Sequence, residues 1–442
     1  MSLTDQIVDL DHLPADQIPE GARAKAQLSL LDWMVCGWAG RDEPLSGKLR
    51  DLAALEGGRP VAHVFGGAPG GMQVPARMAA LVNGAVSHAL DYDDTHFAHV
   101  GHLSVGIYPA ALAVAEELGA SQAQLVEAFV IGAEAAIRIG VALGAAHYNR
   151  GFHQTATAGA FGATVAAARL YGLDADQTRA AIGLCATRAS GLRSQFGTMG
   201  KPYNAGIAAS TGVECAQLAR LGMTSALDGL TGPQGFLDTH SDATHVGDAF
   251  ALPPAQGFLF DDNKYKFHAC CHGTHAMIEG LLAARPAGLT LDDVAGVTLL
   301  TSPRWLSVCD KKAPTTGLEV KFSYAWLAGM ALRGDETGDD RAYTDALARD
   351  PALADFASRV EVTGDAGVTD LQARGQITLR DGQALDFAHD LAAPLPEGLL
   401  RDKLLRKAQA AIGPMGRAFA DHLASPGGIS ARAIGALIAE GA

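Results

Sequence analysis

The 442-residue sequence predicts a mainly α-helical protein with a smaller domain that combines strands and helices. Three observations predict this fold class. From about residue 22 to residue 260 the chain is rich in alanine, and its apolar runs repeatedly end before a glycine, which is a helix-stop signal. Near Pro286 the pattern changes to short alternating runs, which are typical of strands. Two of these runs flank Asp381-Gly382, a dipeptide that favours a hairpin turn.

The elements follow from the same periodicity. In the first part, helices are expected at 78–90, 107–118, 124–143, 155–171, 176–185 and 203–221. In the second part, strands are expected at 294–301, at 358–364 and on both sides of the turn within 375–387, with helical pieces at 322–332 and 342–353. Helices return at 399–411 and 431–438. Glycine supplies 52 of the 442 residues, above the usual ~7%, which predicts close helix packing as well as glycine-terminated helices.

Charge and cysteine content restrict the function class. Lys and Arg total 34 against 48 Asp and Glu, so the formal net charge is −14. An acidic surface repels phosphate, which argues against nucleic-acid and membrane partners and means that an acidic substrate needs a local positive pocket. The six cysteines include no Cys-x-x-Cys pair, so we expect a reducing, cytoplasmic compartment. The acidic N-terminal segment has the wrong sign for a secretion signal.

Four predicted helix starts each carry a histidine or a lysine in or just before the first turn. These residues are His102, His153, Lys201 and His275. Ser104 and Thr274 are expected to cap two of the helices, and Pro202 suits the first turn of a third. A helix N-terminus offers free N–H groups and partial positive charge, so an added cation favours an anion. Several such starts in an acidic chain predict a pocket for a di- or tricarboxylate; four unrelated capped helices are the alternative.

The segment 88–95, His-Ala-Leu-Asp-Tyr-Asp-Asp-Thr, places three carboxylates at the end of an apolar helix. Carboxylates are costly to bury unless they are paired, so Asp91 and its neighbours are candidates for a general base or acid. A solvated helix end is the alternative. Histidines crowd this segment and a second one at 268–275 around Cys270 and Cys271, so a zinc site is a further alternative. The sequence contains no phosphate-binding glycine loop and no Gly-x-Ser-x-Gly element.

The same segments carry a family resemblance. They read HALDYDDT at 88–95, GHLS at 101–104, HYNRGFH at 147–153, GTMGKP at 197–202 and GLEVKFS at 317–323, with a further stretch at 266–275. In this order, over almost the whole length, the chain resembles the MmgE/PrpD family, whose members dehydrate, decarboxylate or epimerise small polycarboxylates. The resemblance departs at Leu103, where the family often has proline, and at Asn204, where it often has histidine.

The resemblance implies a fold and an activity. It implies a large all-helical domain over 1–267, a smaller α+β lid domain over 268–394, and C-terminal helices over 395–442 that return to the helical domain. It also implies a homodimer. The implied activity is that of a lyase that needs no metal and no other cofactor, similar to 2-methylcitrate dehydratase in acting as a hydro-lyase on a small carboxylate substrate. Epimerisation, decarboxylation and non-catalytic carboxylate binding are the alternatives.

The resemblance also implies roles for individual residues. The catalytic candidates are Asp91, His102, His153, Lys201 and His275. The candidates for substrate binding are Thr95, Tyr148, Arg150, Asn204 and His272. In the mechanism that we expect, Lys201 and Arg150 hold substrate carboxylates. Asp91, or His102 paired with it, removes a proton next to a carboxylate. His153 or His275 then protonates the leaving hydroxyl or returns a proton to carbon.

Overall fold

The computed structural model describes residues 1–67 and 70–441, which divide into two compact units. The first unit contains Met1–Tyr265 and the chain from Ile412 onward, and the second contains Lys266–Ala411. The first boundary between the units falls after residue 265, two residues before the predicted boundary after 267. The second boundary falls after residue 411, well beyond the predicted start of the returning helices at 395. Helix α16 (Glu397–Ile412) belongs almost entirely to the second unit, because its Lys403 pairs with Glu279 there.

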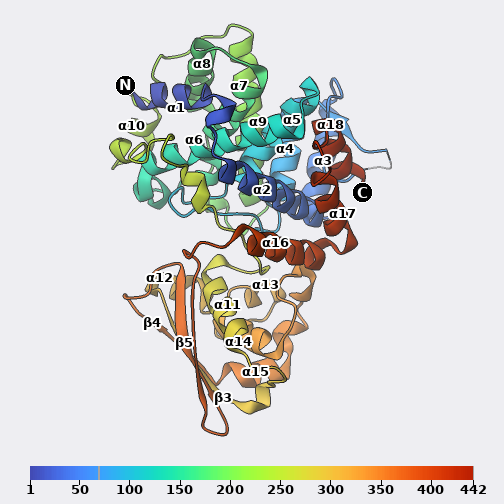
Figure 1. Cartoon of the computed structure of the whole chain (residues 1–442), viewed down its shortest axis with the longest axis vertical. Coiled ribbons are helices and arrows are strands. Elements are labelled where there is room, and N and C mark those ends of the chain that lie inside the picture. Colours follow the sequence, from blue (N-terminus) through green and yellow to red (C-terminus); the bar gives the residue numbers. More distant parts are fainter. Residues whose placement is uncertain (68–69, 442) are drawn as a thin grey trace. The chain divides into compact units, whose positions relative to one another are not determined.

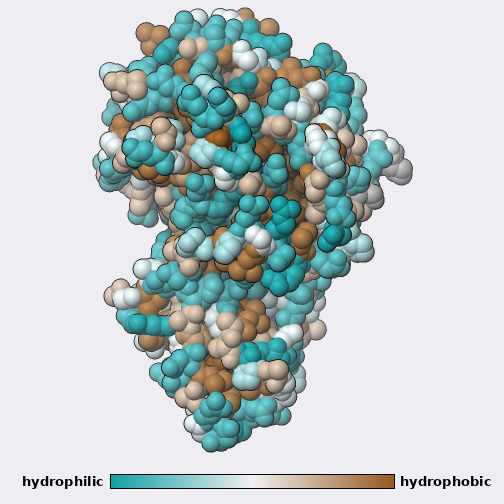
Figure 2. Space-filling view, viewed as in Figure 1, coloured by the Kyte–Doolittle hydropathy of each residue, from teal (hydrophilic) through white to brown (hydrophobic). Residues whose placement is uncertain are grey.

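The first unit is built mainly of helices, as predicted (Figure 1). They are α1 (Leu3–Asp11), α2 (Glu20–Gly40), α3 (Pro44–Glu56), α4 (Ala76–Ser87), α5 (Ser104–Leu118), α6 (Gln122–Asn149), α7 (Gln154–Tyr171), α8 (Ala175–Arg188), α9 (Gly200–Arg220), α10 (Phe236–His240), α17 (Pro414–Leu423) and α18 (Ala431–Glu440). The unit is not purely helical, because two-residue strands β1 (Ala62–His63) and β2 (Gln73–Val74) pair antiparallel. Hydrophilic residues cover most of its visible face (Figure 2).

Glycines let the central helices of this unit approach closely, as the composition predicts. A Cβ atom added at Gly206 on α9 would lie 2.3 Å from the Leu81 carbonyl oxygen on α4. A Cβ atom added at Gly132 on α6 would lie 2.5 Å from the Gly162 carbonyl oxygen on α7. Both distances are far inside van der Waals contact, so any larger residue would force these helices apart. The crossings fix α4, α7 and α9, whose ends carry most of the candidate site residues.

Helix α6 is the longest helix of the described chain. Its regular helix breaks at the predicted stop, Gly144, which has φ +64° and a non-helical backbone, and a second helical segment follows across this kink. By length and hydropathy α6 would suit a membrane span, but 83% of its most apolar 18-residue window is buried against the rest of the protein. Such burial is typical of a core helix in a soluble protein.

The second unit contains the predicted sheet (Figure 1). Its strands β3 (Val294–Thr301), β4 (Val360–Gly364), β5 (Gln372–Leu379) and β6 (Ala384–Asp390) have the order β4-β3-β5-β6. The hairpin β5–β6 turns at Asp381-Gly382, as predicted, and Gly382 has φ +90°. Strands β3 and β4 pair in parallel through Val297 and Val360. Parallel pairing requires a long crossover, which here contains helices.

Helices accompany this sheet within the second unit. They are α11 (His275–Ala284), α12 (Pro303–Cys309), α13 (Gly317–Val320), α14 (Tyr324–Arg333) and α15 (Pro351–Ala357). Figure 1 shows α11, α14 and α15 along one side of the sheet. The predicted helix over 342–353 is wrong in detail: 3₁₀ turns occupy Asp340–Ala342 and Leu347–Arg349, and the helix begins only at Pro351. Asp350 caps that helix by accepting from Ala352 N.

Candidate functional site

The connection between α4 and α5 forms a folded loop that presents the predicted acidic motif. Asp91 has φ +53°, a left-handed conformation that aspartate tolerates better than most residues. Asp94 caps α5 by accepting from the backbone nitrogen of Ser104 at 3.0 Å and from its hydroxyl at 2.6 Å. The prediction that Ser104 caps this helix is therefore wrong, because Ser104 is its first residue and the cap comes from Asp94.

The end of the loop is fixed against the start of α7. The backbone N–H of His102 donates to Thr155 Oγ1 at 3.0 Å. A Cβ atom added at Gly101 would lie 2.8 Å from the Thr155 nitrogen, so glycine is required for this approach. The loop and the N-terminus of α7, where His153 lies, are consequently held together.

Lys201, in the first turn of α9, meets the loop at Asp91. Its ammonium nitrogen lies 2.6 Å from Asp91 Oδ2, and His102 Nε2 lies 3.4 Å from Asp91 Oδ1. The Asp91 side chain is 44% exposed and that of Lys201 is 16% exposed, so solvent reaches both groups. Residues from two of the predicted helix starts therefore converge on one carboxylate.

Asp93 lies behind this pair and is fully buried. Its Oδ2 is 2.7 Å from His102 Nδ1, and its Oδ1 is 2.8 Å from His88 Nδ1. Burial alone would raise the pKa of Asp93, but His102 and His88 outweigh burial and hold that pKa well below its ordinary value. Burial also lowers the pKa of His88. Asp93 is thus an ionised carboxylate that orients two imidazole rings, a role that the sequence does not single out.

His153 is the residue immediately before α7, at the predicted helix start, and its ring is buried. The ring stacks near His88 at a centroid distance of 6.1 Å, and Asn204 Nδ2 lies 3.2 Å from its Nδ1. Burial, followed by His88 and Lys201, lowers the pKa of His153 well below its ordinary value. The ring is therefore neutral at physiological pH.

An exposed segment between α8 and α9 adds residues that the sequence does not single out. The ring of Phe196 lies 5.0 Å from that of His153, and the Lys201 ammonium lies 5.5 Å from the Phe196 centroid. The Arg193 guanidinium lies 3.9 Å from the Tyr148 ring and 5.9 Å from the Phe196 ring. A second cation therefore lies beside the aromatic side chain that contacts both His153 and Lys201.

Two of the predicted substrate-binding residues have other contacts. The Arg150 guanidinium is exposed and pairs with Asp242 at 2.9 Å. Thr95 is half-buried, and its backbone pairs with that of Lys264 through two hydrogen bonds of 2.8 Å. The Thr95–Lys264 bridge anchors the loop just after Asp94.

Three further histidines of this unit serve the fold. His96 Nε2 bonds the Leu259 carbonyl, His99 Nδ1 bonds the Ala136 carbonyl, and His147 bonds the His240 carbonyl and Thr157 Oγ1. Burial lowers the pKa of His96 to about 4, of His99 to about 3 and of His147 to about 4. They are core histidines that stay neutral at physiological pH.

Within the described residues, one group has the spacing of metal ligands. Ligand atoms of His88, Asp91, Asp93 and His102 all lie within 4.8 Å of one another. Both imidazole Nδ1 atoms already contact Asp93, and the Lys201 ammonium already occupies the position next to Asp91 that a cation would take. The donor set suits a divalent metal, but Lys201 already provides a positive charge beside Asp91.

The second unit holds the other predicted histidines in a buried row. The ring of His275 lies 5.0 Å from that of His268 and 4.8 Å from that of His272. Burial, followed by His272 and His268, lowers the pKa of His275 well below its ordinary value. Thr274 occupies the N-cap position of α11, as expected, but its hydroxyl donates to the Cys271 carbonyl and makes no capping hydrogen bond.

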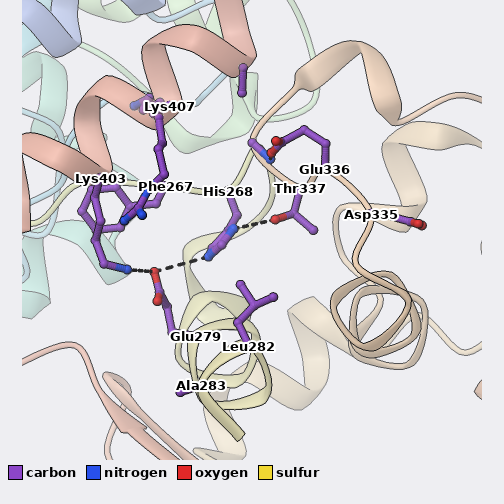
Figure 3. Close-up of a pocket in the computed structure, with 13 residues that line it drawn as sticks. Phe267, His268, Glu279, Leu282, Ala283, Asp335, Glu336, Thr337, Lys403 and Lys407 are labelled. Carbon is purple, nitrogen blue, oxygen red and sulfur yellow. Dashed lines mark hydrogen bonds and ion pairs between the residues drawn. The ribbon is translucent and has the colours of Figure 1, made fainter. Parts of the chain in front are cut away.

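A cavity of about 480 Å³ lies beside His268 in the second unit (Figure 3). His268 Nδ1 is 2.7 Å from the Thr337 hydroxyl, and His268 Nε2 is 3.5 Å from Glu279 Oε1. Lys403 on α16 pairs with the same Glu279 oxygen at 2.5 Å. The chain of contacts in Figure 3 therefore fixes His268, and through ring contact His275, and also attaches α16 to α11.

Glu279→Gln is expected to destabilise the second unit in a pH-dependent way. Burial opposes ionisation of Glu279, but His268 and Lys403 outweigh burial and lower its pKa to about 2. A lowered pKa stabilises the fold above the ordinary value of 4.5, and this stabilisation is lost as pH falls towards 2. We expect the wild type to exceed the variant by about 3 kcal/mol in the free energy of unfolding at pH 7.

Urea unfolding of both proteins between pH 7 and pH 2 measures this difference. Glu319→Gln is the matched control, because Glu319 also has a pKa lowered to about 2 but its side chain is 29% exposed against 12% for Glu279, so its loss has a smaller effect. A difference for Glu279→Gln that stays constant with pH would contradict the prediction.

The fold and the site together define a mainly α-helical protein with a buried aspartate–histidine pair beside an accessible lysine. The family model for the MmgE/PrpD N-terminal domain matches residues 9–248, and that for the MmgE/PrpD C-terminal domain matches residues 268–418. The chain belongs to the MmgE/PrpD family, which confirms the predicted resemblance.

Three curated relatives carry related names. The cis-aconitate decarboxylase of Aspergillus terreus is 26% identical over 433 residues, which cover 91% of this chain and 87% of the relative. The cis-aconitate decarboxylase-like protein oryM of Aspergillus oryzae is 29% identical over 287 residues, covering 61% and 58%. The human cis-aconitate decarboxylase is 32% identical over 157 residues, covering 34% and 32%.

Proposed function

We propose that this protein is a cofactor-independent lyase that acts on a small di- or tricarboxylic acid and releases water. The observation that carries the proposal is the contact of Asp91 with both Lys201 and His102. It places an accessible carboxylate base, a positively charged ammonium group and an imidazole in contact with one another. Removal of a proton next to a carboxylate needs these three components.

In the proposed reaction Lys201 holds a substrate carboxylate and Asp91 removes a proton from the adjacent carbon. Lys201 is suited to this because it combines its own charge with the N-terminus of α9. The electron pair that remains on carbon spreads into the bound carboxylate, where the positive charge stabilises it. The hydroxyl group on the next carbon then leaves, and a carbon–carbon double bond forms.

His102 supplies the proton for the departing hydroxyl in this scheme. Its Nδ1 lies 2.7 Å from Asp93 Oδ2, so its other nitrogen, Nε2, is the one placed to exchange a proton with substrate and with Asp91 at 3.4 Å. The proton that Asp91 has taken returns to His102, so one water is released and the enzyme regains its starting state.

A second candidate function, loss of carbon dioxide in place of water, is favoured by the names of the relatives. These proteins are called cis-aconitate decarboxylases. Decarboxylation leaves an electron pair on the same kind of carbon, and Lys201 would stabilise it in the same way. The two reactions differ in the leaving group, which is water in one and carbon dioxide in the other. They also differ in the role of Asp91, which removes a proton in dehydration and donates one to carbon after decarboxylation.

Proton exchange in heavy water distinguishes these reactions. The purified protein is incubated with citrate, 2-methylcitrate, cis-aconitate, iminodisuccinate and related hydroxy-diacids, and the products are followed by NMR with and without a chelator. New olefinic signals from a hydroxy-acid support dehydration, loss of carbon dioxide supports decarboxylation, and deuterium uptake without another product supports epimerisation. No change with any compound contradicts the proposed function.

Arg193→Gln is expected to raise KM for the carboxylate substrate by about tenfold or more, the size expected for one lost charged hydrogen bond. We propose that Arg193 holds a second substrate carboxylate, because it lies beside Phe196, the residue that contacts Lys201. Arg150→Gln is the matched control and is expected to have a smaller effect, because Arg150 is paired with Asp242. A larger rise in KM for Arg150→Gln than for Arg193→Gln would show that Arg150, and not Arg193, holds the second substrate carboxylate.

Three further parts of the proposal rest on sequence and family. We propose that His275 and His272 take part in the reaction, and the neutral state of His275 suits a hydrogen-bond donor. We propose a homodimer, which light scattering measures. We propose a cytoplasmic location with neither nucleic-acid nor membrane partners, supported by the six free cysteines and the net charge of −14.

A further inference from the structure

We propose that Asn204 fixes His153 as the neutral tautomer that carries its hydrogen on Nε2. His153 then donates a hydrogen bond to a substrate oxygen and serves neither as a base nor as a proton donor. Asn204 is a positioning residue in this scheme, because it acts through His153. The role in catalysis rests on the proposed function, whereas the tautomer follows from the geometry of the free protein.

The orientation of the Asn204 amide follows from the Leu192 carbonyl. Asn204 Nδ2 lies 3.2 Å from the Leu192 oxygen and 3.2 Å from His153 Nδ1. A carbonyl oxygen only accepts hydrogen bonds, so the amide must present its nitrogen here and not its oxygen. The two amide hydrogens serve the two partners. Because an amide nitrogen cannot accept, His153 Nδ1 must be the acceptor and carries no hydrogen.

The segment Gly191–Leu192 holds both members of this pair. The Gly191 carbonyl accepts from the His153 backbone nitrogen at 3.0 Å, while Leu192 orients the Asn204 amide. A Cβ atom added at Gly191 would lie 2.4 Å from Ala156 Cβ and 3.4 Å from Asn204 Cγ, so the segment lies tightly against α7 and α9. Asn204 is itself buried, which excludes water as a competing partner.

The chemical consequence is a donor that keeps its proton. A neutral imidazole with hydrogen on Nε2 stabilises developing negative charge on a carboxylate or enolate oxygen without transferring the proton. Lys201 and the stacked His88 disfavour a second proton on the ring. His153 thus differs from His102, whose Nδ1 faces a carboxylate and whose Nε2 faces Asp91.

The tautomer is measured by NMR of the full-length protein labelled with ¹⁵N-histidine, with His153→Gln to assign the signals. We expect Nδ1 unprotonated and Nε2 protonated from pH 5.5 to 8.5. Hydrogen on Nδ1, or an imidazolium at pH 7, would overturn the inference. If the wild type shows the expected tautomer but converts no compound of the panel, the proposed function fails and the tautomer stands.

Asn204→Asp tests the positioning role. A carboxylate can only accept, so His153 must place hydrogen on Nδ1 or take a second proton. We expect that change in the ¹⁵N signals, with kcat lowered at least tenfold and KM altered less. Asn83→Asp is the matched control, because Asn83 is also buried but its amide contacts the backbone of His63 and Phe65. Unchanged His153 signals and kcat in Asn204→Asp would overturn the role.

Discussion

Lys201→Ala is expected to lower kcat/KM at least 100-fold while the protein stays folded. One positioned acid or base contributes about 10²–10⁴-fold, and in the proposed reaction this lysine both binds the carboxylate and offsets the charge of Asp91. Its loss leaves Asp91 facing an anionic substrate without the ammonium that lies 2.6 Å away. We therefore expect kcat to fall and KM to rise. Steady-state kinetics on the substrate that the panel identifies would measure both.

Lys264→Ala separates this effect from loss of an ordinary ion pair. Lys264 pairs with Asp262 at 2.8 Å, and its side chain is 14% exposed, close to the 16% of Lys201. Its backbone bridge to Thr95 does not depend on the side chain. We expect near-normal kinetics for Lys264→Ala. Wild-type turnover in folded Lys201→Ala would contradict the proposed role of Lys201.

The helical framework was predictable because its signals are local. Glycine ends α5 at Gly119 and α7 at Gly172, both of which have the left-handed conformation that the sequence pattern predicts. At Gly144 the same signal marks a kink, where the chain leaves the helical conformation before a second helical segment begins. The hairpin at Asp381-Gly382 was predictable for the same local reason, whereas the parallel pairing of β3 with β4 depends on contacts more than 50 residues apart in the sequence.

The site was predictable as a set of residue types but not as a set of contacts. Lys201 and His153 could be placed at helix starts, and their positive character pointed to an anion. The sequence could not show that Asp93, and not Asp91, would be the buried partner of His102. The family resemblance selected Arg150 and did not point to Arg193, because which arginine pairs with a surface carboxylate depends on loop geometry.

The neighbouring carboxylates Asp93 and Asp94 show the same limit most clearly. Both are fully buried, both lie in the acidic motif, and no composition rule separates them. Asp94 bonds Ser104 and Asn263 and holds the start of α5. Asp93 bonds two imidazoles. Two neighbouring carboxylates therefore have different roles: Asp94 holds the fold, and Asp93 orients the proposed acid. Because they are adjacent and equally buried, each serves as a control for the other.

Asp93→Asn is accordingly expected to lower kcat by about 10²–10⁴-fold and to lower the free energy of unfolding by about 3–5 kcal/mol at pH 7. An amide cannot accept from both His88 and His102, so one ring loses its orientation. Because the pKa of Asp93 is lowered in the folded state, its stabilisation is present above the ordinary value of 3.8 and is lost as pH falls below it.

The stability difference between the wild type and Asp93→Asn should therefore be constant above about pH 5 and shrink in more acidic buffer, which denaturant unfolding at several pH values measures. Asp94→Asn, the matched control, keeps an oxygen that accepts from the Ser104 backbone nitrogen, because asparagine caps helices about as well as aspartate, and should keep turnover within about tenfold of the wild type. If instead Asp94→Asn lost turnover and Asp93→Asn kept it, the proton donor would have to be sought away from His102, because Asp93 is the carboxylate that contacts its Nδ1.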